Sequence, residues 1–224
     1  MYKLLANKTL DWLPMDTKEL YEKNLKNRYN DLVKYNWINN HFTYKMNSLG
    51  FRCEEFNDQP SIMFLGCSLT CGIGIPAEAR WSELVSKELN LQHVNLGIGG
   101  GSSDLAFRLC VGYVDKIKPK IIIFMVPPGI RIELLFSTYI LSLKTGDEQN
   151  SYYKQWASDE NNHYFNLMKN KYAIEKMCSD RGIKLLIIDD FQPILPIFVS
   201  LARDLTHPGI ESNRICADKV LSLL

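Results

Sequence analysis

The chain of 224 residues has no long apolar run and no excess of charge of either sign. Its longest strongly apolar stretch, residues 121–128, is far shorter than the roughly 18 residues that a membrane-spanning helix requires. The 26 basic and 25 acidic residues give a formal charge of +1, so no basic field indicates nucleic-acid binding and no acidic tail indicates a solvating extension. We therefore expect a soluble protein with neither a membrane span nor a nucleic-acid partner.

The first residues also lack the apolar segment and the small-residue cleavage site that mark a secretory signal peptide. This absence favours a cytoplasmic location. A virion component, or a protein exported by another route, would show the same pattern.

The six cysteines are too scattered to indicate a disulfide framework; they are Cys53, Cys67, Cys71, Cys110, Cys178 and Cys216. Cys67 and Cys71 lie four residues apart, but no second pair of cysteines or histidines completes a zinc-like set. Because scattered cysteines are typical of a reducing compartment, we predict free thiols and no bound metal.

From residue 59 onward, short apolar runs alternate with amphipathic stretches. The predicted strands are residues 61–65, 94–96, 120–126 and 183–188, and the predicted helices are residues 78–89, 102–117, 163–181 and 208–224. Nearly continuous apolar strands separated by helices indicate a parallel sheet that is covered on both faces. The predicted fold class is α/β, with three layers in the order α/β/α.

The segment before this pattern, residues 1–58, contains one predicted helix over residues 17–37, with Asp16 or Thr17 as its cap. We predict that this segment is an N-terminal helical extension packed on a main domain of residues 59–224. The alternative is a separate, small partner-binding segment.

Residues 137–162 interrupt the alternation of strands and helices and have the character of an insertion. Polar residues alternate there with aromatic ones such as Tyr152, Tyr153 and Trp156. Such a composition suits a lid or a sugar-contacting loop, and it equally suits a solvated loop that its aromatic residues anchor to the body.

Two short motifs about 140 residues apart carry the side chains of a nucleophilic hydrolase. In the first, Gly-Cys-Ser-Leu-Thr, Ser68 directly follows a predicted strand; in the second, Asp-Leu-Thr-His-Pro, Asp204 lies three residues before His207. A serine hydroxyl is a poor nucleophile until an imidazole takes its proton, and a carboxylate fixes the imidazole in the correct tautomer. The alternative is a serine that caps the next helix and a histidine at a helix entry.

The position of these residues along the fold supports one shared site. In parallel α/β sheets, ligands bind at the carboxyl ends of the strands. Ser68, Gly100 and Pro127 each fall just beyond the end of a predicted strand.

The two motifs resemble those of the SGNH (GDSL-like) hydrolases, a family of esterases and acylhydrolases. There a Gly-Asp-Ser turn carries the nucleophile and a later Asp-x-x-His carries the acid and the base. The stretch Asn-Leu-Gly-Ile-Gly-Gly at residues 95–100 is similar to the family's second block, and residues 47–52 are similar to a segment that precedes the nucleophile strand in some members. The resemblance implies a flavodoxin-like parallel sheet.

The resemblance also implies the role of each site residue. Ser68 would be the nucleophile, His207 the general base and Asp204 the group that orients it. The backbone N–H groups of Ser68 and Gly100 would bind the oxyanion, with an uncertainty of one position at the glycine because Gly99 and Gly101 flank it. Asn95 would open the oxyanion loop and lie near the substrate. No metal or organic cofactor is needed for this chemistry.

Two departures from the family pattern stand out. Cys67 occupies the position of the usual Asp, which would weaken support of the turn; a thiol nucleophile at Cys67 would need a lowered pKa. The family's oxyanion Asn after the third strand is missing, and Pro127 and Pro128 stand there without an N–H to donate. Arg131 is a candidate replacement or a ligand for an acidic substrate group, unless it pairs with Glu133 or lies at the surface.

The leading functional hypothesis is a serine esterase that removes a small acyl group, such as an O-acetyl group from a carbohydrate, through an acyl-enzyme. One alternative is a catalytically silent protein of the same fold that binds a glycan or a protein partner. Another is an acyltransferase, which uses the same acyl-enzyme but passes the acyl group to a sugar hydroxyl.

Overall fold

The computed structural model describes residues 2–137, 140–144, 146–147, 149–196 and 199–224. Its centre is a four-stranded parallel sheet in the order β4-β3-β5-β8. The strands are β3 (Ser61–Leu65), β4 (Gln92–Asn95), β5 (Ile121–Met125) and β8 (Lys184–Ile188). In this register Leu65 pairs with Phe124, so the strands end together at one edge of the sheet. The predicted α/β fold with a parallel sheet is confirmed.

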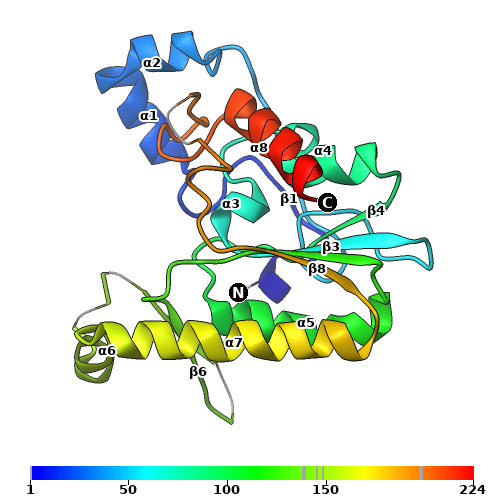
Figure 1. The fold of residues 1–224 in the computed structure, drawn as a ribbon. Helices are drawn as coiled ribbons and strands as arrows, with labels where there is room; N and C mark the ends of the chain where they lie inside the picture. The colour runs from blue at the N-terminus through cyan, green and yellow to red at the C-terminus, as the bar shows by residue number, and fades with distance from the viewer. Residues whose placement is uncertain (1, 138–139, 145, 148, 197–198) are drawn as a thin grey trace.

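Two layers of helices cover the sheet (Figure 1). On one face lie α5 (Ser103–Ile117) and α7 (Glu160–Asp180); on the other lie α4 (Trp81–Glu88) and α8 (Ile210–Leu223). Alternate residues of each strand point to opposite faces, so Phe64 packs against Trp81 of α4, with their ring centroids 5.3 Å apart.

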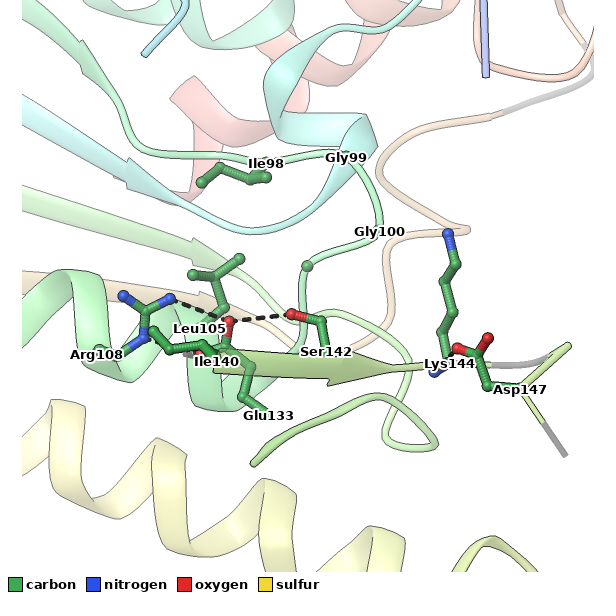
Figure 2. A pocket seen from close by; sticks show the side chains of 11 residues that line it. Ile98, Gly99, Gly100, Leu105, Arg108, Glu133, Ile140, Ser142, Lys144 and Asp147 are labelled. Atoms are coloured by element: carbon green, nitrogen blue, oxygen red, sulfur yellow. Dashed lines mark hydrogen bonds and ion pairs between the residues drawn. The ribbon is translucent and has the colours of Figure 1, made fainter. Parts of the chain in front are cut away.

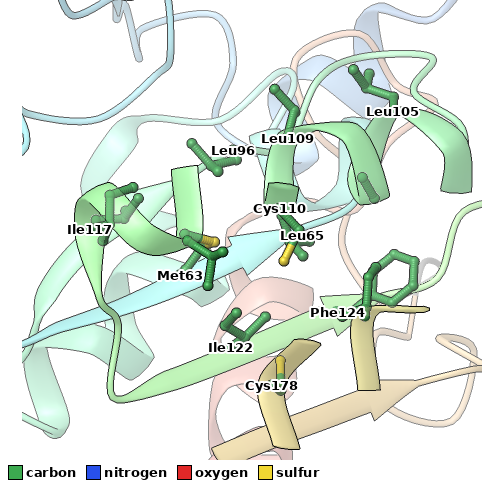
Figure 3. Close-up of a cluster of buried hydrophobic side chains, with 14 of the residues drawn as sticks. Met63, Leu65, Leu96, Leu105, Leu109, Cys110, Ile117, Ile122, Phe124 and Cys178 are labelled. Atoms are coloured by element: carbon green, nitrogen blue, oxygen red, sulfur yellow. The ribbon is translucent and has the colours of Figure 1, made fainter. Parts of the chain in front are cut away.

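Figure 3 shows the core on the other face, between the sheet and the helices α5 and α7. The side chains from the strands and those from the helices are all buried; among them are Met63, Leu65, Ile122, Phe124, Leu109, Cys110 and Cys178. These apolar residues explain why the strands could be found from the sequence, because both of their faces are covered.

Shorter elements complete the fold. They are the 3₁₀ helices η1 (Tyr2–Leu5) and η2 (Ala77–Ala79), the helices α1 (Lys18–Asn27), α2 (Tyr29–Lys34), α3 (Ser68–Cys71) and α6 (Ser151–Ala157), the two-residue strands β1 (Thr9–Leu10) and β2 (Tyr44–Lys45), and the strands β6 (Ile132–Leu135) and β7 (Ile140–Leu143). The pairs β1–β2 and β6–β7 are antiparallel. Among the described residues no helix is long and apolar enough to cross a membrane.

Several boundaries differ from the predicted ones for local reasons. The helix predicted over residues 17–37 is broken at Arg28, whose side chain reaches the carbonyl oxygen of Leu205 at 3.0 Å. Thr17 caps α1 as expected, because its hydroxyl accepts the N–H of Leu20 at 3.2 Å. The region predicted as an insertion contains β7 and α6, and β6 precedes it. The division into an extension and a main domain stays a prediction.

The N-terminal segment packs against the chain before α8 (Figure 1). Its side chains form one small core with residues from both sides of the candidate site; the buried members are Leu32, Trp37, Ile75, Ala202 and Leu205. A second small core joins Tyr44 to Cys71 and Ile73, just after the candidate nucleophile.

Candidate active site

The candidate nucleophile stands on a tight turn between β3 and α3. Gly66 has φ +157, and a Cβ there would lie 2.2 Å from Thr70 Oγ1, so the turn requires glycine. Ser68 is the first residue of α3 and is 4% exposed. Cys67 stands at the cap position and makes no side-chain cap hydrogen bond. The thiol therefore does not replace the support that an Asp would give this turn.

Asp204 and His207 are held together in a compact loop. One carboxylate oxygen of Asp204 accepts the N–H groups of Thr206 and His207, both at 2.9 Å, and the other is bonded to His207 Nδ1. Leu205 between them has φ +56, in the left-handed region. The loop thus fixes the carboxylate and the imidazole before any substrate is present.

The charge of Asp204 sets the tautomer of His207. Burial raises the pKa of the Asp204 carboxyl, but the hydrogen bonds and charge of His207 outweigh it, and the pKa is lowered overall. Next to this anion, Nδ1 of His207 carries the proton and donates it, which leaves Nε2 with a free lone pair. A general base requires this tautomer.

The two motifs meet through Gly74, which follows α3. Its carbonyl oxygen accepts the N–H of Arg203 at 2.9 Å, and a Cβ on Gly74 would lie 3.5 Å from Asp204 Cγ. The same segment is tied to the nucleophile turn, because the N–H of Ile73 donates to the carbonyl oxygen of Ser68 at 3.2 Å. The fold therefore brings Ser68 and the Asp204–His207 loop side by side.

Among the described residues no hydrogen bond joins Ser68 Oγ to His207. His207 is 7% exposed, so both side chains are nearly covered. Catalytic hydrogen bonds are often long or misaligned without substrate and tighten only when the substrate binds. The lack of this bond therefore does not exclude Ser68 and His207 as candidate nucleophile and base.

Asn95 supports the site from beneath. Its amide donates to the carbonyl oxygen of Thr70 at 2.7 Å and to Ser82 Oγ at 3.3 Å, and its oxygen accepts the N–H of Gly97 at 2.9 Å. The side chain is buried and its bonds all run to the protein. Asn95 therefore connects α3 to the glycine-rich loop. Its side chain has a structural role and does not face a ligand.

The backbone around Gly100 narrows the choice of an oxyanion donor. The N–H of Gly101 donates to the carbonyl oxygen of Ile98 at 2.9 Å, and that of Gly99 is directed at the sulfur of Cys71. Within the described residues the N–H of Gly100 donates no hydrogen bond, and neither does that of Ser68. Both of these N–H groups are therefore available to bind an oxyanion.

Arg131 lies beside the same loop. Its Nη1 is 3.4 Å from the carbonyl oxygen of Gly101. Glu133 pairs instead with Arg108, through two bonds of 2.9 and 3.0 Å. The ion pair between Arg131 and Glu133, which was one alternative for this residue, is not made.

A second Ser-His-Glu arrangement occurs nearby, and it was not predicted from the sequence. His93 Nδ1 is 2.9 Å from Glu83 Oε2, and its Nε2 is 3.0 Å from Ser82 Oγ. Burial lowers the pKa of His93 to about 4; burial raises that of Glu83, but the His93 bond and charge outweigh it and lower the pKa to about 2. Ser82 is fully buried, so its hydroxyl cannot reach a substrate. The sequence held one sign of this arrangement. His93 and Asn95 are two residues apart on β4, and residues at that spacing face the same side of a strand.

The N-terminal segment braces the Asp204 loop, and sequence reasoning missed this. Arg203 pairs with the buried Asp16 at 2.7 Å and donates to the carbonyl oxygen of Asp11 at 2.6 Å. Its guanidinium lies 4.0 Å from the ring centroid of Trp12 and 4.1 Å from that of Phe42. Four residues of the segment thus fix the residue next to the candidate acid.

Further bonds join the same segment to both halves of the site. The amide of Asn24 donates to the carbonyl oxygen of Asp204 at 3.1 Å. The hydroxyl of Tyr44 is bonded to Asp16 and accepts the N–H of Gly74 at 2.8 Å. Asp16 therefore links, through Arg203 on one side and Tyr44 on the other, the acid loop to the segment that follows the nucleophile.

A cavity of about 460 Å³ lies beside the glycine-rich loop (Figure 2). Residues from the loop, from α5 and from the β6–β7 region line it; they are Ile98, Gly99, Gly100, Gly101, Leu105, Arg108, Glu133, Ile140, Ser142, Lys144 and Asp147. Ser68 and His207 are not among them. A Cβ on Gly101 would lie 3.4 Å from the carbonyl oxygen of Gly66, so the loop that lines the cavity packs against the nucleophile turn.

All six cysteines are free of disulfide bonds. Within the described ranges of the chain, no cluster of three or more His, Cys, Asp or Glu side chains is arranged to hold a metal ion.

No protein-family model and no curated protein matches the sequence. Solved structures do resemble the fold. A structure titled TesA covers 72% of this chain and 96% of its own, with 12% identity and a TM-score of 0.51. The esterase EstA from Pseudoalteromonas sp. covers 72% and 94%, with 13% identity and a TM-score of 0.41. A lipolytic protein of the G-D-S-L family from Veillonella parvula covers 73% and 97%, with 17% identity and a TM-score of 0.39. At such identities the likeness concerns the fold alone, and the protein has the fold of the SGNH hydrolases.

Proposed function

We propose that the protein is a serine ester hydrolase that removes a small acyl group through Ser68, His207 and Asp204. The observation that carries the proposal is the hydrogen bond between the ionised Asp204 and Nδ1 of His207. The loop that holds this pair packs against Gly74, in the segment that follows Ser68. A buried carboxylate, a histidine in the basic tautomer and a serine at a strand end form the set that acyl transfer requires.

In the proposed reaction, Ser68 Oγ attacks the ester carbonyl while His207 Nε2 takes the hydroxyl proton. The negative charge that develops on the carbonyl oxygen is stabilised by the N–H groups of Ser68 and Gly100. His207 then protonates the leaving alcohol, and water, activated by the same imidazole, hydrolyses the acyl-enzyme.

The proposed enzyme would be slow by the standard of its fold. Pro127 and Pro128 supply no N–H where the family places an Asn, and removing one preorganised oxyanion donor typically lowers the rate by about 10²–10³. The Asp204–His207 pair would still activate the serine, so the rate falls without the mechanism being lost.

The substrate that we propose is a small acyl ester of a carbohydrate, for example an O-acetyl group. Support comes from the cavity beside the glycine-rich loop, whose lining includes the polar side chains of Glu133, Ser142 and Asp147. Such groups suit the hydroxyls of a sugar better than a long aliphatic chain.

The competing function is a silent binding protein of the same fold. It is favoured by the near-complete burial of Ser68 and His207 and by the missing bond between them. An acyltransferase would use the same acyl-enzyme and differ only in the acceptor that reaches it.

Hydrolysis of p-nitrophenyl acetate tests the proposal. The wild-type protein should turn over the ester well above the buffer rate, and Ser68→Ala should reduce turnover to that rate. Cys67→Ala is the matched control, since it changes the adjacent side chain and should keep most of the activity. Turnover lost in Cys67→Ala and kept in Ser68→Ala would identify a thiol enzyme; a wild-type rate equal to the buffer rate would favour the binding protein.

A further inference from the structure

The cavity beside the glycine-rich loop contains a cation, Lys144, that forms no ion pair with any described residue. Lys144 follows β7, and its Nζ lies 3.6 Å from the position that a Cβ on Gly100 would take. Figure 2 shows this side chain extending from the end of β7 toward Gly100. Within the described residues Lys144 makes no ion pair. Its charge is therefore directed at the loop that holds the proposed oxyanion donor.

The other charges around the cavity do not cancel that of Lys144. Glu133 is engaged by Arg108 through two bonds and also accepts the hydroxyl of Ser142 at 3.4 Å. Asp147 accepts the backbone N–H of Lys144 at 2.9 Å, so its carboxylate lies at the base of the lysine and not at its tip (Figure 2).

A second cation, Arg131, directly precedes β6 and lies beside the glycine-rich loop. Arg131 Nη1 lies by the carbonyl oxygen of Gly101 and, in the part of the chain that the structure describes, forms no ion pair. Arg131 thus lies near Gly101 and Lys144 near Gly100. Lys144 lines the cavity and Arg131 does not. A negatively charged group of a ligand in the cavity would be attracted to Lys144, because no described carboxylate pairs with that lysine.

The size and polarity of the space suit one ring of a sugar. Ligand cavities typically measure about 300–1,000 Å³, and this one measures about 460 Å³. Ser142 and Asp147 provide hydrogen-bonding groups for hydroxyls, and Leu105 and Ile140 provide apolar surface for a ring face.

From these observations we propose that the cavity binds a carboxylate-bearing sugar, so that the substrate is an acyl ester of a sugar acid with its carboxylate at Lys144. The identity of the substrate as an ester rests on the proposed esterase function. The binding of a sugar acid rests on the cavity alone.

The test compares acetate esters of methyl glucuronoside, which keeps its free carboxylate, and of methyl glucoside; the two sugars differ in charge at one ring position. The ratio of kcat/KM for the acidic ester to that for the neutral one should exceed one in the wild type. Lys144→Gln should lower this ratio about fivefold, the scale of one exposed charge pair, and Lys144→Arg should restore it. Raising the salt concentration should also lower the wild-type ratio.

Lys120→Gln, a change at an exposed lysine just before β5, should leave the ratio unchanged and serves as the matched control. An equal ratio in the wild type and in Lys144→Gln would overturn the proposal.

Binding by calorimetry separates the two proposals. Ser68→Ala should bind glucuronate more tightly than glucose, and adding Lys144→Gln should remove the difference. Preferential binding of glucuronate without turnover of any ester, p-nitrophenyl acetate included, would contradict the proposed esterase function and support the proposed charged binding site. Ester turnover with equal binding of the two sugars would support the proposed esterase function and contradict the proposed charged binding site.

Discussion

At the scale of single residues, Asp204 has the most defined role. It accepts two backbone N–H groups and one imidazole N–H, and it is buried. An amide in its place would keep the shape but lose the negative charge, and its NH₂ group would face a donor. The imidazole would then be held in the wrong tautomer, with its proton on Nε2.

Asp204→Asn should therefore reduce kcat for p-nitrophenyl acetate by about 10³–10⁴, the size of effect that this substitution has in a serine protease triad. KM should change little, because the substrate does not contact Asp204. Steady-state kinetics measure both quantities. A loss of less than about tenfold would show that Asp204 is only a loop residue.

His93 provides a second test at this scale, on stability. Its pKa is lowered from 6.5 to about 4, because burial opposes its charged form. The unfolded chain therefore takes up a proton near pH 6.5, whereas the folded protein does so only near pH 4. Stability from His93 is fully present above pH 6.5 and is lost as the pH falls toward 4.

Between pH 6.5 and 5, the free energy of unfolding of the wild type should fall by about 2 kcal/mol through this group alone. His93→Gln should be less stable at pH 7 and should lose correspondingly less across the same range. Urea unfolding at several pH values measures the difference. Parallel curves for the two proteins would mean that His93 titrates normally in the folded state.

At the scale of elements, the site depends on a close contact between the segment after α3 and the loop before α8. Gly74 has φ +78, and a Cβ there would lie 2.7 Å from Cβ of Ala202 and 3.3 Å from the backbone nitrogen of Arg203. Neither neighbour is the tip of a flexible side chain, so the loop itself would have to move.

Gly74→Ala should accordingly displace the Asp204 loop and remove most of the esterase activity, while the protein remains folded. The matched control is Gly112→Ala on α5, where a Cβ meets nothing within 4 Å and should not impair the protein. Circular dichroism and p-nitrophenyl acetate turnover check both variants. Full activity in Gly74→Ala would contradict the role of this contact.

The same scale shows what the sequence could and could not reveal. Strand β3 has the predicted bounds, because Ser61–Leu65 is apolar on both faces and lies between Pro60 and Gly66. Strand β6 was not predicted: Leu135 points to solvent and Glu133 is held by Arg108, so its pattern is neither alternating nor buried. The break at Arg28 also has a distant cause, a bond to a residue 177 positions away.

At the scale of the whole molecule, the N-terminal segment is part of the site's framework. Asp16 and Arg203 are 187 residues apart, and both are buried. No periodicity or motif connects them, which is why sequence reasoning could propose Ser68, Asp204 and His207 as site residues but not the residues that hold them. A buried ion pair is informative here because removing one partner leaves the other charge without compensation.

Asp16→Asn should lower the free energy of unfolding by about 3–5 kcal/mol and reduce esterase activity through movement of the Asp204 loop. The double variant Asp16→Asn with Arg203→Met should be less destabilised than the sum of its single changes. As a control, Glu22→Gln breaks an exposed pair with Lys18 and should change stability by less than about 1 kcal/mol. Chemical denaturation compares these four variants, Arg203→Met included, with the wild type. Unchanged activity in Asp16→Asn would show that the segment is independent of the site.

The most direct test of the central claim is labelling of the wild-type protein with a fluorophosphonate, followed by mass spectrometry to locate the modified residue. The account predicts one adduct, on Ser68, which requires His207 and is absent in His207→Ala. An adduct on another residue, or no adduct on the folded protein, would contradict the claim that this fold carries an activated serine.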